Sequence, residues 1–154
     1  MLNLEIVCND ERYLPTYAHE TDACMDLKVK IEKDGEYNEE KVGIIQPNET
    51  KVFGTGVQVS IPKGYAMLIF PRSSTGFKLH CMLVNQVAVI DEDYRDEIHL
   101  GITNFGNTSV CLNDGQRVAQ FMIVPKCKIN LISVEDDEQF RATDRKGGIG
   151  STGE

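Results

Sequence analysis

Apolar and polar residues alternate with a period of two along most of the chain, which is the spacing of half-buried β-strands. The alternating or continuous apolar stretches are Val57 to Ile61, Ala66 to Phe70, Val87 to Ile90, Ile98 to Thr103, Phe121 to Val124 and Lys128 to Leu131. Turn-forming residues lie between them, in Lys33 to Gly35, Pro62 to Gly64, Asn104 to Asn107 and Asn113 to Gly115. Short strands joined by such turns predict an all-β fold, a jelly-roll-like β-barrel or sandwich.

A helical period is not sustained over any long window of the sequence. One short helical turn is expected after Ser73, within Ser74 to His80, where a serine is suited to cap the first turn. Residues 135–154 differ from the rest, because they are first acidic and then rich in glycine, with few apolar side chains. We therefore expect one β-barrel domain over residues 1–134 and a mobile C-terminal arm over residues 135–154.

Length and charge narrow the function classes. The 154 residues suffice for one domain, and 16 basic against 24 acidic residues give a net charge of −8. This charge argues against binding to nucleic acid or to an anionic membrane. The longest apolar run, Tyr65 to Phe70, is too short to span a bilayer, and the N-terminus does not resemble a secretory signal. Five cysteines without a C-x-x-C pair indicate free thiols in a reducing cytosol, and the three histidines have no metal-binding spacing.

The segment Pro71 to Gly76 follows an apolar strand directly. Arg72 offers a guanidinium, Ser73 and Ser74 offer hydroxyls, and a helical turn offers unpaired N–H groups, a combination that suits a phosphate. The alternative interpretation is a strand-to-turn corner with a capping serine and a surface arginine.

The acidic cluster from Asp91 to Arg95 follows the apolar stretch Val87 to Ile90. Asp91 would lie at the inner end of the turn, where a carboxylate can orient a water molecule as general base. Tyr94 would add an aromatic wall beside it. A solvated hairpin tip is the alternative.

Two further segments are suggestive but weak alone. Gln120 is a polar residue at the edge of an apolar strand, in Gly115 to Gln120, where it could simply cap the sheet. The segment Asp144 to Gly153 combines glycines, hydroxyls and two cations, as in a flexible anion clamp or a disordered linker.

Taken in order, these segments resemble the five motifs of the trimeric deoxyuridine triphosphate nucleotidohydrolases (dUTPases). The matching segments are Thr21 to Leu27, Pro71 to Ser74, Asn85 to Arg95, Gly115 to Gln120 and Arg145 to Gly153. The resemblance therefore extends from about Asp22 to the C-terminus, and five motifs in the right order are highly specific.

The resemblance implies hydrolysis of dUTP to dUMP and pyrophosphate, which supplies dUMP for thymidylate synthesis. Asp91 would activate the water that attacks the α-phosphorus, and Mg²⁺ would bridge the triphosphate, with Asp26 as an outer-shell ligand through water. The residues implied to hold phosphate are Arg72, Ser73, Ser74, Gln120, Arg145, Ser151 and Thr152. The residues implied to hold the nucleoside are Asn85, Ala88, Val89, Ile90, Tyr94, Ile149 and His99, with His99 across the hairpin from Val89. A cytoplasmic homotrimer with sites at subunit interfaces, closed by the C-terminal arm, is implied as well.

Several positions depart from the family pattern. Cys24, Gln86, Ala88 and Asp96 stand where glycine is common. Glu32 to Gln46 is longer than usual and would extend a surface hairpin, and one residue separates Arg145 from the glycines that follow it. Ile149 occupies the position of an aromatic residue that usually stacks on uracil. These departures concern the geometry of the arm and the base pocket.

Two alternatives share the scaffold. A dCTP deaminase would need a catalytic glutamate where this chain has Gly101. A nucleotide-gated regulatory protein is the other alternative, and the insertion from Glu32 to Gln46 would be a natural contact for an unknown partner protein. Asp91, Tyr94 and Gln120 argue that catalysis is retained.

Overall fold

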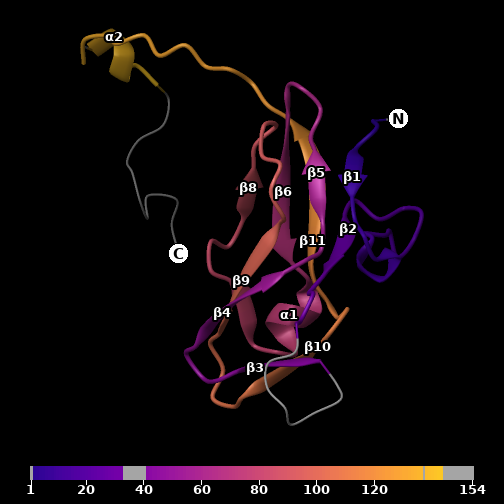
Figure 1. The fold of residues 1–154 in the computed structure, drawn as a ribbon. Coiled ribbons are helices and arrows are strands. Elements are labelled where there is room, and N and C mark those ends of the chain that lie inside the picture. The colour runs from indigo at the N-terminus through magenta and orange to yellow at the C-terminus, as the bar shows by residue number, and fades with distance from the viewer. Residues whose placement is uncertain (1, 33–40, 137, 144–154) are drawn as a thin grey trace.

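The computed structural model of the chain describes residues 2–32, 41–136 and 138–143 (Figure 1). These residues fold mainly into short strands, as the alternating pattern predicts. The strands are β1 (Glu5–Val7), β2 (Met25–Lys28), β3 (Val42–Ile45), β4 (Thr50–Gly54), β5 (Gln58–Ser60), β6 (Tyr65–Pro71), β7 (Cys81–Leu83), β8 (Ala88–Ile90), β9 (His99–Asn104), β10 (Val110–Asn113) and β11 (Arg117–Pro125). The all-β prediction is therefore confirmed.

Helical structure is limited to three short elements in the described ranges: a 3-10 turn at Glu11–Tyr13, α1 (Ser73–Phe77) and α2 (Glu138–Arg141). Helix α1 lies where the sequence predicts a helical turn. The expected serine cap is wrong, because Arg72 occupies the N-cap position and its side chain makes no capping hydrogen bond. No helix in these ranges has the length and apolar character to cross a membrane.

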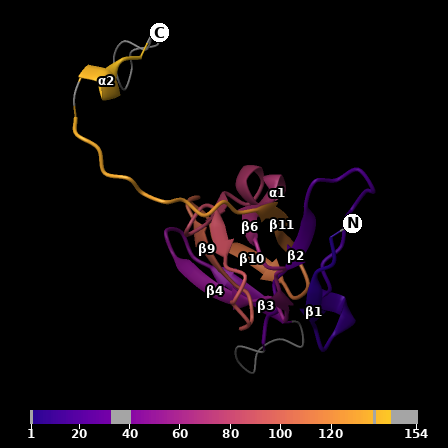
Figure 2. The same ribbon diagram turned by 90° about the horizontal axis from the view of Figure 1, so that it is seen from above.

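The strands form four antiparallel sheets, and the two larger ones enclose the core. Their orders are β2-β11-β6-β8 and β4-β9-β7, with the pairs β1-β5 and β10-β3 beside them. In Figure 2 the strands β2, β11 and β6 lie on one side of the barrel, and β4 and β9 lie on the other. The jelly-roll-like barrel therefore consists of two curved layers with apolar side chains between them.

The period-two pattern accounts for the core. Inward-facing side chains from both layers and from the segments beside them are almost fully buried, among them Leu27, Val29, Val57, Val59, Met67, Ile69, Ile98, Leu100, Ile102, Val118 and Phe121. The intervening residues, such as Gln58 and His99, are exposed. Burial of one face of most strands stabilises the fold and fixes the register of those strands.

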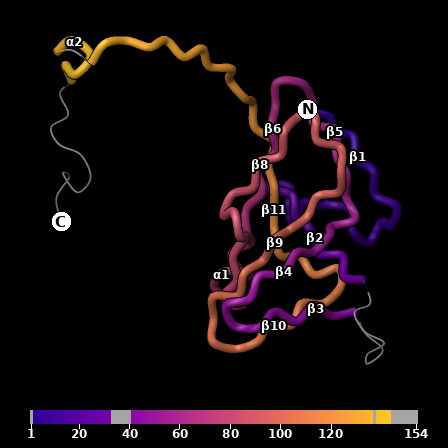
Figure 3. The backbone as a smooth tube through the Cα atoms, turned by 60° about the vertical axis from the view of Figure 1, so that its left-hand side comes forward, coloured from indigo at the N-terminus to yellow at the C-terminus, as the bar shows by residue number. Residues whose placement is uncertain are grey.

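One predicted strand does not form. Residues 126–136 leave the barrel after β11 as an extended segment and lead to α2, which lies away from the strands (Figures 1 and 3). Ile129 and Leu131 are 84% and 88% exposed there. Their alternation satisfies the strand pattern, but no strand in the described part of the chain pairs with them.

Candidate active site

Helix α1 begins at a bulge in the neighbouring strand β11. The β2-β11 register shifts between Arg117 and Ala119, which leaves Val118 without a partner in β2. The Val118 carbonyl oxygen accepts two hydrogen bonds, from the Arg72 backbone N–H at 3.1 Å and from the buried Thr75 hydroxyl at 2.7 Å. Bulges commonly redirect the chain beside active sites. Here the bulge fixes the first turn of α1 against the sheet.

Asp26 lies at the centre of the charged groups near α1. Its carboxylate is buried, and it accepts from Arg72 Nε at 2.8 Å and from Arg117 Nη1 at 3.1 Å. Two arginines against one carboxylate leave an excess positive charge at this end of the barrel. Because both guanidinium groups remain partly exposed, the cluster is suited to an anion such as a polyphosphate.

Gln120 belongs to the same end of the barrel. It lies opposite Asp26 of β2 on one side and Phe70 of β6 on the other. Its side-chain Nε2 donates to the Pro71 carbonyl oxygen at 3.4 Å. Ser73 is exposed and Ser74 is half-buried at the start of α1. The structure therefore brings together Asp26, Arg72, Ser73, Ser74 and Gln120, which we name the phosphate end.

Arg117 was not predicted as a site residue, although it lies within the segment Gly115 to Gln120, which resembles a family motif. Its side chain joins the phosphate end because of the bulge, and a bulge leaves no clear signal in the sequence. The one sequence feature that indicates a role for Arg117 is the Gly-x-Arg pattern before an apolar strand.

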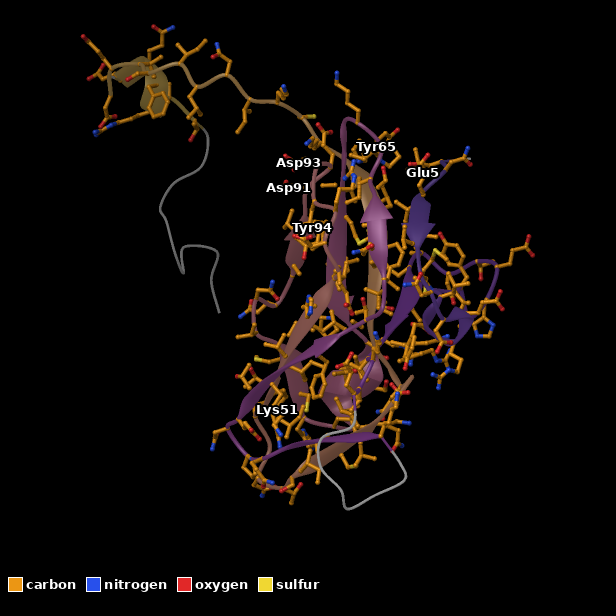
Figure 4. The ribbon with its side chains drawn as sticks, in the orientation of Figure 1. Glu5, Lys51, Tyr65, Asp91, Asp93 and Tyr94 are labelled. Atoms are coloured by element: carbon orange, nitrogen blue, oxygen red, sulfur yellow. The ribbon has the colours of Figure 1, made fainter. Side chains whose placement is uncertain are left out.

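Asp91 and Tyr94 lie on a turn at the opposite end of β6 and β8 (Figure 4). Asp91 is exposed, and its backbone carbonyl accepts from the Tyr94 N–H at 3.2 Å, which closes the turn. The Tyr94 hydroxyl donates to the Glu97 carbonyl oxygen at 2.8 Å. This bond fixes the direction of the Tyr94 ring relative to the turn.

The acidic cluster also contains the carboxylate of Glu92, for which no role was predicted. Glu92 Oε2 accepts from the Gly64 N–H at 2.6 Å and forms an ion pair with Lys126 at 3.2 Å. These two partners lower the pKa of the Glu92 carboxyl, the Gly64 hydrogen bond more than Lys126. Glu92 therefore ties the Asp91 turn to the residue at which the chain leaves β11.

The residues implied to read the base lie along and just before β8. Asn85 and Val89 are exposed, Ile90 is half-buried and Ala88 is buried. The backbone between Asn85 and β8 is sharply bent, since Gln86 has a φ of 56°. Exposed peptide groups on this side of β8 are able to face a planar ligand.

The predicted position of His99 is wrong. His99 lies opposite Gly54 in β4, whereas Val89 lies opposite Leu68 in β6, so the two residues do not face each other across a hairpin. The cause is that β8 joins the four-stranded sheet and β9 joins the three-stranded sheet. The His99 ring makes a 2.9 Å hydrogen bond between Nδ1 and the Glu97 carbonyl oxygen.

The two groups of residues lie far apart within one chain. Ile90 of β8 pairs with Met67 of β6, and Met67 precedes Arg72 by five residues in the sequence. At ~3.3 Å per residue, about 17 Å of strand separates the Asp91 turn from the phosphate end. Figures 1 and 4 show the same separation, with α1 and the Asp91 turn at opposite ends of β6. The described part of one chain therefore places the two groups at opposite ends of the β6-β8 pair.

The remaining predicted residues are Arg145, Ile149, Ser151 and Thr152. They lie outside the residues that the structure describes. Residues 33–40, which make up most of the insertion and include the turn Lys33 to Gly35, lie outside them as well.

The dUTPase family matches residues 10–153 of the chain. The deoxyuridine 5'-triphosphate nucleotidohydrolase of Chlamydia caviae is 34% identical over 154 residues, which cover 98% of this chain and 99% of the relative. The dUTPase of Staphylococcus bacteriophage 80alpha, solved with dUpNHpp, has a TM-score of 0.80 at 25% identity and 99% coverage of both chains. A dUTPase of phage phi11 of S. aureus, described with a structural Mg(II) ion, has a TM-score of 0.73 at 24% identity and covers 89% of this chain and 99% of its own. The chain thus belongs to the dUTPase family.

Proposed function

We propose that this protein hydrolyses dUTP to dUMP and pyrophosphate. Water attacks the α-phosphorus, a new P–O bond forms, the bond to the pyrophosphate oxygen breaks, and Asp91 accepts the proton of the attacking water. The proposal rests on one observation: this chain, which belongs to the dUTPase family, has both the phosphate end and the turn that holds Asp91 and Tyr94. The product dUMP would serve thymidylate synthesis.

The phosphate end would hold the triphosphate. Arg72 offers a charged donor that is already oriented by Asp26, and Ser73, Ser74 and Gln120 offer neutral donors beside it. Pre-oriented donors of this kind stabilise charge as it develops on a phosphoryl group. Arg117 is a further candidate because it shares the Asp26 carboxylate with Arg72.

The donor set fits a Mg²⁺ ion that arrives with the substrate. Within the described ranges no group of three or more His, Cys, Asp or Glu side chains is arranged to hold a metal. Both Asp26 oxygens already accept from arginines, so Asp26 would act through water in the outer shell. Magnesium usually keeps several waters and takes few protein ligands, and it would neutralise charge on the triphosphate.

The turn at the other end of β6 would hold the nucleoside. Asn85 and the backbone of Ala88, Val89 and Ile90 would bind the uracil edge. Tyr94 would pack against the deoxyribose and leave no space for a ribose 2′-hydroxyl. The Tyr94 hydroxyl bond to the Glu97 carbonyl supports this role, because a tethered ring excludes an added group better than a mobile one.

A homotrimer with shared sites is part of the same proposal. It is supported by the separation of Asp91 from Arg72, which one chain alone does not bring together. The exposed apolar residues Ile129, Leu131, Ile132 and Val134 support it as well, since a neighbouring subunit would cover them. In this arrangement the catalytic domain of residues 1–134 comprises the barrel and the extended segment that leaves it after β11, and the arm of residues 135–154 closes over a site.

The arm would act through the residues that the resemblance implies. Arg145, Ser151 and Thr152 would bind the γ-phosphate, and Ile149 would cover the base. The cytosol is the proposed location, because all five cysteines are free thiols, as is usual in a reducing compartment. The acidic net charge supports the absence of a nucleic-acid partner.

Deamination of dCTP is disfavoured by the backbone at Gly101. A side chain there would place its Cβ 2.8 Å from Val84 Cγ1, so a catalytic glutamate does not fit without displacing Val84. The regulatory alternative has no described contact to support it.

The test is pyrophosphate release from dUTP, dCTP, dTTP and UTP in the presence of Mg²⁺, with light scattering on the same sample. We expect hydrolysis of dUTP alone and a mass three times the 17.2 kDa of one chain. Release of ammonia from dCTP, or equal turnover of all four nucleotides, would contradict the proposal.

A further inference from the structure

The loop after β4, residues 55–57, forms hydrogen bonds with Glu97 and Ile98, which follow the Asp91 turn. Glu97 Oε1 accepts from the Gly56 N–H at 2.7 Å. The Ile98 N–H donates to the Val57 carbonyl at 2.9 Å, and the Thr55 hydroxyl donates to the Ile98 carbonyl at 2.8 Å. We name these three bonds the Glu97 clasp.

The clasp requires two glycines. A Cβ on Gly54 would lie 2.4 Å from Glu97 Oε1, which is closer than any side chain tolerates without moving the carboxylate. Gly56 has a φ of 71°, a conformation that residues with a Cβ rarely adopt. The glycines let the loop backbone approach Glu97, and its carboxylate reaches the Gly56 N–H for that reason.

The same residue holds Tyr94. The Glu97 carbonyl oxygen accepts from the Tyr94 hydroxyl at 2.8 Å and lies 2.9 Å from His99 Nδ1. The Glu97 side chain is thus bound to the loop while its backbone binds the Tyr94 ring. The position of the ring depends on the position of the Glu97 peptide, which the clasp fixes.

We propose that Glu97 is a positioning residue that sets the selectivity between deoxyribose and ribose through Tyr94. The inference rests on the proposed function, in which Tyr94 excludes the ribose 2′-hydroxyl. Glu97 does not touch the nucleotide. It holds the peptide to which the Tyr94 hydroxyl is tethered, so loss of the carboxylate lets the ring move away and admits the larger sugar.

The experiment compares wild type with Glu97→Ala, Glu97→Gln and Tyr94→Phe. Two ratios are measured: kcat/KM for dUTP over UTP, and Kd for the imido-triphosphates of uridine over deoxyuridine. Glu97→Ala should lower both ratios by roughly three- to ten-fold, the effect of losing one hydrogen bond. Glu97→Gln should stay within about two-fold of wild type, because the amide oxygen still accepts from Gly56. Tyr94→Phe keeps the ring but loses the tether, and it should behave as Glu97→Ala.

Glu49→Ala is the matched control. Glu49 Oε2 accepts from the Gln46 N–H at 2.6 Å, so this variant also loses one carboxylate–backbone bond, in the turn before β4. Both alanine variants should lose thermal stability, but only Glu97→Ala should change the ratios. Unchanged ratios in Glu97→Ala or Tyr94→Phe would overturn the inference, as would equal changes in Glu97→Ala and Glu97→Gln. If wild type binds the deoxyuridine analogue but does not hydrolyse dUTP, the proposed function fails, and the binding ratios alone decide on Glu97.

Discussion

Asp114 connects the N-terminal part of the chain to the barrel. The buried Tyr13 hydroxyl donates to its carboxylate at 2.8 Å, and the Ile31 N–H donates to Oδ1 at 2.8 Å. Burial and the nearby carboxylate raise the pKa of Tyr13 to about 12. The phenol is therefore bound in its protonated form.

Tyr13→Phe should lower the free energy of unfolding at neutral pH by about 1.5–3 kcal/mol, the usual value of a hydrogen bond to a charged acceptor. The tyrosine pKa is ~10 in an unfolded chain, so the stability that this bond provides is complete below pH ~10. It is lost as the pH rises towards about 12, where the folded protein also ionises. Urea unfolding from pH 8 to 12 should show this alkaline loss in wild type and a smaller one in Tyr13→Phe. Tyr17→Phe, at an exposed tyrosine, is the control and should match wild type.

Asp91→Asn should retain binding of a non-hydrolysable dUTP analogue and lose turnover. The amide preserves the shape of the side chain but does not accept the proton of water, and general-base catalysis contributes ~10²–10⁴-fold. Steady-state kcat and a binding titration separate the two effects. Asp96→Asn, at an exposed carboxylate on the same turn, should keep most of the activity. Wild-type kcat in Asp91→Asn would remove Asp91 from the mechanism.

At the scale of single elements, the strands with the clearest apolar pattern were predicted. β5, β6, β8, β9 and β11 follow the alternating or continuous apolar pattern. β7 and β10 also bury alternate residues, but they are short and were not predicted. β1 was not predicted because all three of its residues are exposed, so no burial pattern marks it. Residues 128–131 alternate between apolar and polar side chains but form no strand. An alternating pattern indicates that one face of a segment will be covered, but it does not indicate which surface covers it.

The link between Glu92 and Lys126 joins the Asp91 turn to the end of β11. Its partners lower the pKa of Glu92 in the folded chain, so its stabilising effect is present above the usual glutamate pKa of ~4.3 and is lost as the pH falls below it. Glu92→Gln should therefore show a weaker fall in stability between neutral pH and pH 3 than wild type. Thermal unfolding across this range measures the difference. Identical acid profiles would mean that the link contributes nothing to folding.

At the scale of the whole molecule, the motifs predict which residues form the site but not how those residues are distributed over the barrel. Arg72 and Asp91 belong to neighbouring motifs, yet Arg72 follows β6 at one end of the β6-β8 pair and Asp91 follows β8 at the other end. The separation follows from the register between β6 and β8, which the local pattern does not specify. The proposed site shared between subunits would bring residues from the two ends together.

A shared site predicts that two inactive variants restore each other. Asp91→Asn and Arg72→Gln alter opposite ends of the barrel, so a mixed trimer contains one interface with both residues intact. Mixed trimers, co-expressed with two affinity tags and purified through both, should regain about one third of wild-type activity, because one interface of three is complete under cyclic symmetry. Asp91→Asn mixed with Tyr94→Ala is the matched control, since both changes affect the same turn and every interface keeps one defect. Recovery only in the first mixture supports the shared site. If the first mixture remains as inactive as its parents although mixed trimers form, each active site belongs to a single chain. The about 17 Å of strand between Arg72 and the start of the Asp91 turn must then be bridged in another way.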